Sequence, residues 1–525
     1  MKNHEIAAAW SYHDGTKHSQ ESLRTNRHYL DWETQPIPFK IYRNLEPIPL
    51  SQQLSSSGMP ALEAISQIAA EAQGSVSATC QILAEILFLS AGITRRRSYP
   101  GWEMLFRAAA CTGALYHIDI YLVCGDLADL EAGVYHFSPH DFALRRLRQG
   151  DYRGVVIGAA GAEPSLLKAR AILISASTFW RNAWKYQSRA YRHCYWDNGT
   201  ILANLLAAAA ARRVYAKVVL GFRDAPVSDL LGLDSQREAV LSLVALGHTG
   251  DESAAPWRDI EPLEPETVPL SKKEVEYPAM RAMHEASSLE SEGEVVTWRG
   301  AAKSRGIEDA GVNQADGARK DERRIFRLQP LSQTEMPQDS FEDVIMRRGS
   351  TRQFSREPIT FAQLSTMLDR ATRAIAGDVL DPEDPLNDLY LIVNAVEGLP
   401  AGAYVYQRAS RALELLKPGE FRSEAGYLGL GQAIPADCSV NVYFLADLQR
   451  VLKRFGNRGY RAAQLEASIT AGKLYLAAYA QRLGASGLTF FDDDVIDFFS
   501  PHAAGKSVMF LIALGKSALA SQPAA

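Results

Sequence analysis

The segment RRGSTRQFS, residues 347–355, carries the clearest group of side chains suited to binding an anion. It places Arg347, Arg348, Ser350 and Arg352 within six positions. Guanidinium groups bind phosphate through paired, charge-assisted hydrogen bonds, and a serine hydroxyl adds another donor. We therefore predict that these four residues hold a phosphate. The alternative is the solvated basic end of a helix, because short basic runs are common on surfaces.

Other residue types with metal-binding or nucleophilic chemistry are present but poorly spaced for it. The five cysteines form no CxxC pair and have no histidines at zinc-site spacing. Asp492, Asp493 and Asp494 are consecutive, so a regular element cannot converge them on one ion. Aspartate is favoured at a helix start, and we expect these residues to begin the helix that follows. We predict no metal site.

Charge and hydropathy exclude several classes of partner. The chain has 525 residues, with 56 basic against 61 acidic side chains and a formal net charge of -5. This balance gives no general electrostatic reason to bind nucleic acid or an anionic membrane. No stretch of about 18 apolar residues predicts a membrane span, and the amino terminus lacks an apolar core of signal-peptide length. We expect a cytoplasmic protein with reduced thiols.

The elements that position these residues come from a domain that occurs twice. Residues 119–153 and 388–422 align without a gap at an offset of 269, with 12 identities in 35 positions. In each copy, apolar strands alternate with turns in a pattern that favours antiparallel pairing. An Ala-rich apolar helix follows in both, and each copy ends in an apolar strand, VLSLVALGH at 240–248 and VMFLIALGK at 508–516.

This duplication predicts an α+β fold made of two antiparallel-rich sheets, wrapped by helices and packed through long central helices. Two copies on one chain imitate a two-fold dimer, so we expect an intramolecular pseudo-dimer. We assign residues 1–50 to a wrapping segment, 51–265 to the first domain and 336–525 to the second. Residues 266–335 are predicted to be a partly disordered linker, because much of this stretch is polar, Gly-rich and without period.

Several motifs resemble the nitroreductase superfamily, in particular its SagB/ThcOx branch of azoline dehydrogenases. The similarity spans nearly the whole chain outside the predicted linker. The motifs are YHDGTKHS at 12–19 with LDWETQPIPFKIY after it, RAAACTGALYHIDIYLV at 107–123, WKYQSRAYRHCYWDNG at 184–199, RRGSTRQFS at 347–355 and GLTFFDDD at 487–494.

The resemblance implies FMN bound between the two halves, with each site built from both. RRGSTRQFS then holds the FMN phosphate. Thr489 and Phe490 lie beside the flavin N5, and Lys516 follows the last strand as a base near the phosphate. A loop of small residues from the other half meets the ring, which such residues allow to approach the backbone closely. Its members are Ala110, Cys111, Thr112, Gly113, Ala114 and Leu115.

The two copies retain complementary parts of this pattern. The stretch of the first copy that matches the arginine segment, residues 61–73, contains no arginine. The stretch of the second copy that matches the small-residue loop, VLDPED at 379–384, carries a proline and three carboxylates. One intact phosphate segment and one intact ring loop predict a single composite FMN site per chain.

The resemblance also assigns catalysis to Lys185 and Tyr186, as general base and proton relay. The alternative is an amphipathic helix start with Lys185 in solvent. The function predicted is FMN-dependent dehydrogenation of an azoline, carried by a small molecule or a peptide. Two alternatives remain, an NAD(P)H-dependent nitro- or quinone reductase and an inactive partner-binding protein. Fold-level resemblance does not fix a substrate.

Overall fold

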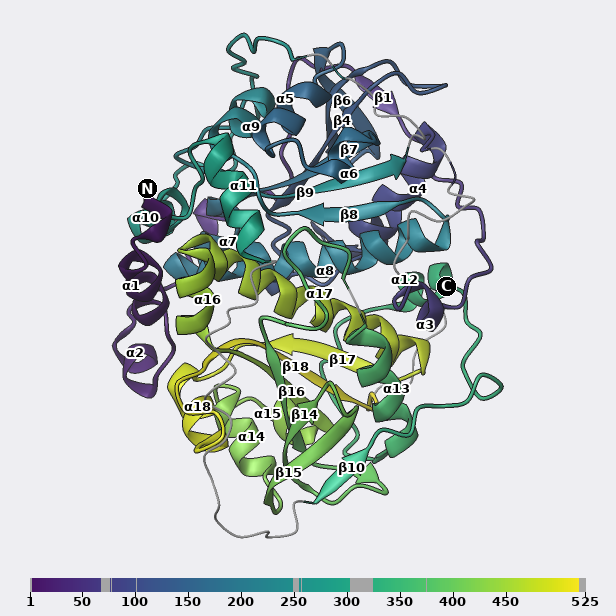
Figure 1. Ribbon diagram of the computed structural model, residues 1–525, viewed down its shortest axis with the longest axis vertical. Helices are drawn as coiled ribbons and strands as arrows, with labels where there is room; N and C mark the ends of the chain where they lie inside the picture. Colours follow the sequence, from purple (N-terminus) through teal and green to yellow (C-terminus); the bar gives the residue numbers. More distant parts are fainter. Residues whose placement is uncertain are drawn as a thin grey trace.

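The computed structural model describes residues 2–67, 76, 78–100, 102–248, 255, 257–302, 324–373 and 375–518. Two halves lie one above the other, each with its own sheet and with two long helices between them (Figure 1). Each half holds a seven-stranded sheet, and the strand orders are β1-β6-β5-β4-β7-β9-β8 and β10-β15-β14-β12-β16-β18-β17. Corresponding strands occupy the same places in both, which confirms the predicted α+β duplication.

The sheet of the first half is antiparallel throughout, with apolar central strands. β4 is buried along its whole length, and so are the other central strands apart from Arg170, the second residue of β7. The strands are β1 (Pro47–Pro49), β4 (Ile118–Cys124), β5 (Gly133–Ser138), β6 (Ala143–Gln149), β7 (Ala169–Thr178), β8 (Ala216–Val219) and β9 (Glu238–His248). Its helices are α3 (Ala61–Ala64), α4 (Cys80–Ala91), α5 (Arg153–Ala159), α6 (Pro164–Leu167), α7 (Phe179–Tyr186), α8 (Ala190–Ala211) and α9 (Asp224–Leu231).

The second half repeats this arrangement and adds a short parallel pair, β11 (Ile359–Thr360) with β13 (Val396–Glu397). Its sheet strands are β10 (Ile325–Arg327), β12 (Asp388–Val393), β14 (Gly402–Gln407), β15 (Ala412–Pro418), β16 (Val440–Ala446), β17 (Gly484–Leu488) and β18 (Ser507–Gly515). Its helices are α12 (Phe341–Arg347), α13 (Phe361–Ala371), α14 (Arg422–Leu428), α15 (Ala433–Asp437), α16 (Leu448–Phe455), α17 (Arg458–Ala480) and α18 (Asp492–Phe499).

The long helices α8 and α17 pack against each other between the two sheets (Figure 1). They approach so closely that glycine is required at the crossing. A Cβ added to Gly199 would lie 2.0 Å from the Ser468 hydroxyl, and one added to Gly472 would lie 2.6 Å from the Cβ of Ala203. The Ala-rich sequences of both helices follow from this contact, because small side chains let helix axes approach.

Two mirrored clusters of buried ions join the halves. Arg189, the last residue of the short 3-10 helix η4 (Gln187–Arg189), and Arg192 of α8 bind Asp492, at the start of α18 in the second half. Arg458 and Arg461 of α17 bind Asp224, at the start of α9 in the first half. Asp492 to Asp494 do begin a helix, as predicted, and Asp492 also reaches across the interface.

The duplication extends to the amino-terminal helices. Arg192 donates hydrogen bonds to the His13 carbonyl and the Thr16 hydroxyl, at the end of α1 (Ala7–Gly15). Arg461 makes the same two bonds at the end of α10 (Pro278–Ala286), to the His284 carbonyl and to a serine hydroxyl. The segment 1–50, predicted to wrap the surface, therefore buries part of α1 at the interface.

The segment 266–335, predicted to be a partly disordered linker, contains two helices. α10 is the counterpart of α1, and α11 (Glu292–Ala301) occupies the place in sequence of α2 (Gln20–Thr25). α11 buries Val295 and Trp298. Residues 303–323 lie outside the described residues.

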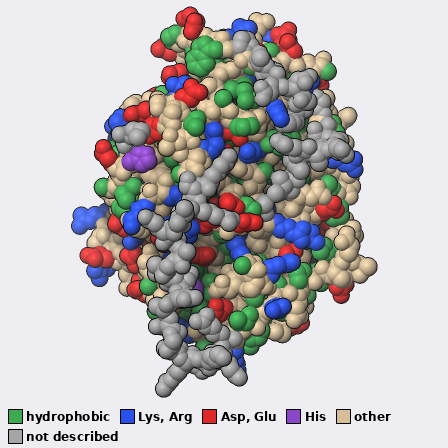
Figure 2. All heavy atoms as spheres, in the orientation of Figure 1, with side chains coloured by type: hydrophobic (Ala, Val, Ile, Leu, Met, Phe, Trp, Pro, Cys, Tyr) green, Lys and Arg blue, Asp and Glu red, His purple; other side chains and the backbone are tan. Residues whose placement is uncertain are grey.

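Among the described residues no helix is long and apolar enough to cross a membrane. On the face shown in Figure 2, basic and acidic side chains are interspersed.

Beyond the two sheets, the first half carries a hairpin that the second half does not share among the described residues. It consists of β2 (Ile93–Tyr99) and β3 (Trp102–Arg107) and leads directly into the predicted ring loop.

Candidate cofactor and active site

The predicted ring loop adopts an unusual backbone. Its centre is the short 3-10 helix η3 (Thr112–Ala114), in which Gly113 has φ of 64°. Ala114 and Tyr116 also have positive φ, at 54° and 48°. Residues other than glycine rarely adopt this conformation, and such strain is typical of functional loops whose shape the surroundings impose.

Asp197 of α8 imposes that shape through a set of hydrogen bonds. Its carboxylate accepts from the Thr112 amide at 2.9 Å and from the Thr112 hydroxyl at 2.7 Å. It also accepts from Cys111 Sγ at 3.0 Å and contacts His117 Nε2 at 2.9 Å. Burial, and then the neighbouring Asp197, raise the pKa of the Cys111 thiol.

Cys111, His117 and Asp197 offer three potential metal-ligand atoms within 4.8 Å of one another. The prediction of no metal site did not foresee this cluster. Cys111 Sγ and His117 Nε2 both bond to the Asp197 carboxylate, and His117 Nδ1 lies 2.8 Å from the Ser177 hydroxyl. These contacts satisfy the carboxylate and position the loop.

The predicted phosphate segment of the second half meets this loop of the first half. Arg348 is buried, and it donates from Nε to the Ala108 carbonyl at 2.7 Å and from Nη2 to the Arg107 carbonyl at 3.0 Å. Ser350 lies 3.5 Å from the Tyr475 hydroxyl, and Arg352 is exposed. The segments predicted to combine across the interface therefore do lie together.

Arg347 turns away from the other three residues of the segment. Its guanidinium pairs with Asp339 and donates to the Tyr479 carbonyl at 2.8 Å. Lys516 makes no hydrogen bond or ion pair with those three residues either. Its ammonium pairs with Glu357 at 3.3 Å, and its side chain is 41% exposed. The contacts of both residues are with other protein groups, and their predicted part in phosphate binding stays a prediction.

Tyr186 lies directly against the ring loop. A Cβ added to Gly113 would lie 2.8 Å from the Tyr186 hydroxyl. Burial raises the pKa of Tyr186, and the charges of Asp197 and Cys111 raise it further. Lys185 is exposed, with Nζ 5.4 Å from the centre of the Tyr186 ring. The structure therefore brings Tyr186 to the ring loop and leaves Lys185 at the solvent boundary.

Thr489 and Phe490 follow β17 and present polar groups that the protein does not satisfy. Their amide groups donate to no acceptor among the described residues. The Thr489 hydroxyl is buried and also has no hydrogen-bond partner in the described part of the chain. Buried polar groups are normally paired, so these unpaired donors are available to a ligand.

Comparisons with known proteins now decide the family. The Nitroreductase family model matches residues 56–248 and 345–516, which together are more than half of the chain. The chain belongs to the nitroreductase family. A crystal structure from Anabaena variabilis, assigned as a nitroreductase, is 25% identical with a TM-score of 0.75, over 97% of this chain and 99% of that one. A protein assigned as a nitroreductase by name in Methanocaldococcus jannaschii is 26% identical over 29% of this chain and 81% of its own.

In this tandem nitroreductase the duplication defines a second location that corresponds to the candidate site. It is built from the matching segments with the roles of the two halves exchanged. There the Asp378 carboxylate accepts the amides of Leu220 and Gly221, both at 2.9 Å. Leu220 and Gly221 follow β8 as Thr489 and Phe490 follow β17. An acceptor from the chain itself thus occupies the place that remains open in the first location.

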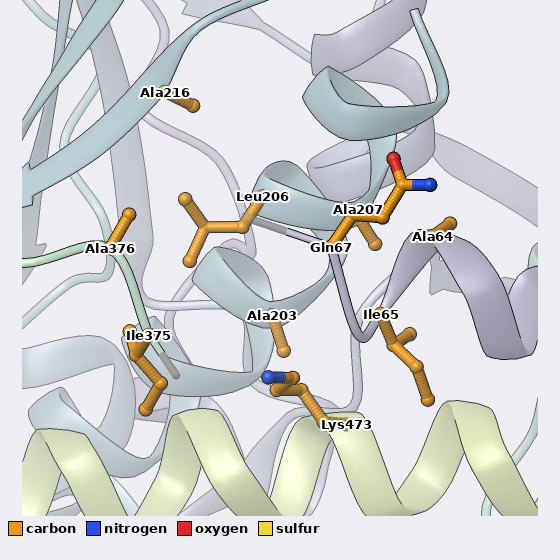
Figure 3. A pocket seen from close by; sticks show the side chains of 10 residues that line it. All are labelled: Ala64, Ile65, Gln67, Ala203, Leu206, Ala207, Ala216, Ile375, Ala376 and Lys473. Atoms are coloured by element: carbon orange, nitrogen blue, oxygen red, sulfur yellow. The ribbon is translucent and has the colours of Figure 1, made fainter. Parts of the chain in front are cut away.

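The main chain also closes this second location. The Val218 amide donates to the Ala376 carbonyl at 2.9 Å, so residues 376–378 pair with the edge of β8. The small cavity that remains is shown in Figure 3, where Lys473 rises from α17 toward Ala203 of α8. Lys473 is nearly fully buried and donates to the Arg373 carbonyl at 3.1 Å. Its counterpart in the first half is Asn204.

Sequence reasoning missed three residues of the open site. Asp197 is separated from Thr112 by 85 positions, so only the folded chain reveals their contact. Arg95 of the β2–β3 hairpin comes within 3.7 Å of a Cβ placed on Gly349, which adds a guanidinium beside the phosphate segment. Tyr475 of α17 accepts the Gly487 amide and lies beside Ser350. For Arg95, the run of three arginines at 95–97 was the available signal in the sequence.

Proposed function

We propose that this nitroreductase-family protein is an FMN-dependent oxidoreductase with one composite site per chain. The observation that carries the proposal is the difference between the two related locations. One has an unpaired amide pair and a buried unpaired hydroxyl at Thr489 and Phe490. In the other, Asp378 already satisfies the corresponding amides.

The residues of the open location fit FMN. Arg348, Ser350 and Arg352 with Arg95 offer cationic and hydroxyl donors for a phosphate. Gly113 and the small side chains beside it allow a planar ring to lie against the loop. The amides at 489 and 490 and the Thr489 hydroxyl are donors for the acceptor atoms along the edge of a flavin.

Bound FMN supplies the acceptor for a hydride, while the protein orients the substrate and handles protons. Tyr186 keeps its hydroxyl proton at neutral pH, because burial and nearby negative charge raise its pKa. It is therefore suited to pass a proton between a substrate at the ring loop and Lys185, which contacts solvent. The exposure of Lys185 does not match a desolvated base, so we assign it the exchange of that proton with water.

The reaction we propose is oxidation of an azoline ring to the corresponding azole, in which the substrate loses one proton and one hydride. The proton path that this reaction needs runs through the Tyr186 hydroxyl to the Lys185 amine in its neutral form, which accepts the proton and then releases it to water. This choice of substrate rests on the resemblance of the motifs rather than on a contact in the structure, and fold alone does not determine a substrate.

The test has two steps. Released flavin is first counted against protein by absorbance, and we expect one FMN per chain. Conversion of a thiazoline to a thiazole is then followed in the ultraviolet for wild type, Tyr186→Phe and Lys185→Ala, with the exposed Lys272→Ala as control. We expect about 10²-fold slower turnover for Tyr186→Phe. Two FMN per chain would contradict the single site, and unchanged turnover in both variants would remove the proton path.

Rapid bleaching of the bound flavin by NADH or NADPH, without oxidation of a thiazoline, would instead identify a reductase. The names of both relatives favour including this measurement.

A further inference from the structure

Two aromatic side chains are exposed on the segment that follows α2, and we call Tyr29 and Trp32 the aromatic rim. Tyr29 is 80% exposed and Trp32 is 67% exposed. Trp32 belongs to the short 3-10 helix η2 (Trp32–Thr34). Large aromatic groups that remain in water when the fold is complete often mark a binding surface.

The rim is held firmly to the turn that carries Lys185 and Tyr186. A ring nitrogen of His28 lies 3.0 Å from the Trp184 carbonyl, and the Trp184 indole donates to the Asp31 carbonyl at 3.0 Å. The rings of Trp32 and Trp184 meet edge to face with their centres 5.4 Å apart. The contacts of His28, Asp31 and Trp32 with Trp184 thus fix the position of Trp32.

The same contacts connect the rim to the open site. Trp184 belongs to a small apolar cluster that includes Leu115 of the ring loop, with Leu30 and Tyr186 packed against it. Buried packing contacts therefore connect the ring loop, through Tyr186 and Trp184, to the exposed Trp32. The rim thus lies at the surface beside the turn that carries Lys185 and Tyr186, where a substrate that reacts at the ring loop can contact it.

The related segment of the second half does the opposite. α11, which occupies the place of α2, buries Trp298 against Phe455, the counterpart of Tyr186. The Trp298 indole donates to the Phe455 carbonyl at 2.8 Å. Arg454, the counterpart of Lys185, donates to the Ala301 and Ala302 carbonyls. The amino-terminal region of the second copy thus buries its tryptophan against the counterpart of Tyr186, whereas that of the first copy leaves Tyr29 and Trp32 exposed.

We propose that Tyr29 and Trp32 bind an aromatic or heterocyclic group of the substrate adjacent to the reacting ring. The substrate class is then an extended molecule with at least two planar groups, such as a peptide in which an azoline is flanked by an aromatic residue. This inference rests on the proposed function for the identity of the reacting ring. The exposed faces of Tyr29 and Trp32 stack on planar groups and leave charged groups in water.

The experiment compares two short peptides that each contain one thiazoline, flanked by phenylalanine in one and by glycine in the other. Binding to the FMN-loaded full chain is measured by calorimetry, and turnover is measured by absorbance. The proteins are wild type, Tyr29→Ala, Trp32→Ala and the control Trp257→Ala. Trp257 is also exposed, at 55%, but it packs against Gly158 of α5, at the outer end of the first half (Figure 1).

We expect the wild type to bind the phenylalanine peptide about fivefold more tightly than the glycine peptide. Trp32→Ala and Tyr29→Ala should reduce that preference with FMN content unchanged, through KM rather than kcat, and Trp257→Ala should keep it. Equal affinity of the wild type for both peptides, or a preference that survives both rim variants, would overturn the proposal. Binding preference without thiazole formation would instead refute the dehydrogenase function and leave the rim supported.

Discussion

Arg192 of the first half and Asp492 of the second form a buried ion pair, with 2.6 Å between Nη1 and Oδ1. Arg461 and Asp224 repeat the pair in the opposite direction at the same distance. Each carboxylate binds a second arginine as well, Arg189 or Arg458. The two halves are therefore joined twice by charge clusters that water does not reach.

The first prediction concerns loss of one such carboxylate. Burial alone would raise the pKa of Asp492, but Arg189 and Arg192 lower it well below its usual range. Asp492→Asn leaves two buried guanidinium groups without a counter-charge, and we expect a loss of about 3–5 kcal/mol in the free energy of unfolding. Urea denaturation of the full chain measures it.

The control for this prediction is Asp493→Asn. The Asp493 carboxylate is 69% exposed and pairs with Lys17 at the surface. Exposed pairs contribute at most about 1 kcal/mol, so this variant should unfold close to the wild type. Equal destabilisation by the two substitutions would show that the buried cluster does not join the halves.

A second prediction tests the phosphate segment without disturbing the fold. Arg352 is exposed, and its guanidinium forms no ion pair with a described residue. Arg352→Ala should therefore leave the unfolding transition unchanged while weakening FMN binding about tenfold or more, because a charge-assisted donor to phosphate is lost. Fluorescence titration of the apoprotein with FMN measures the change.

The matched control is Arg356→Ala, four positions along. Arg356 is also exposed but pairs with Asp437. FMN affinity that is reduced equally in the two variants would indicate a general effect of surface charge rather than a phosphate contact.

Much of the fold was predictable, because the repeat preserves its pattern of apolar strands and its spacing. The amino-terminal helices of the second copy were not. α10 and α1 share two identical positions, Ala279 with Ala8 and His284 with His13, and a hydroxyl residue three positions after the histidine. A polar sequence around α10 indicated a linker. The two helices are equivalent because Arg192 and Arg461 make the same hydrogen bonds to them. Both arginines lie far along the chain, so these bonds are seen only in the folded protein.

The candidate site divides in the same way. Local motifs predicted Arg348, Ser350 and Gly113, because phosphate binding and close backbone approach leave a recognisable composition, and the structure brings these segments together across the interface. They did not identify Asp197, whose bonds to Thr112 span 85 positions. Nor did they predict that Asp378 fills the related location. Asp378 directly precedes the stretch VLDPED, which in sequence shows only that the small residues of the ring loop are missing.

The third prediction follows from the contact between Gly113 and Tyr186. Gly113 has φ of 64°, and a Cβ there would lie 2.8 Å from the Tyr186 hydroxyl. Gly113→Ala should displace Tyr186 and slow turnover about tenfold or more, with FMN content largely kept. Gly58→Ala, which also has positive φ but no atom within 4 Å of an added Cβ, controls for backbone strain. Similar turnover in both variants would mean that the position of Tyr186 does not matter.

The last prediction concerns Lys473, buried at the closed location between α17 and α8. Burial lowers the pKa of its amine to about 7, from the ordinary 10.5. The unfolded chain therefore binds more protons than the folded chain between pH 7 and pH 10.5, and the free energy of unfolding rises with pH across that window. Lys473→Met removes this dependence. Relative to that variant, the wild type should gain about 2–3 kcal/mol between pH 7 and pH 9, measured by urea denaturation at both pH values. Lys417→Met, at an exposed site of the same half, serves as the control. A wild type and Lys473→Met variant whose stabilities change in parallel with pH would show that the amine remains charged in the closed location.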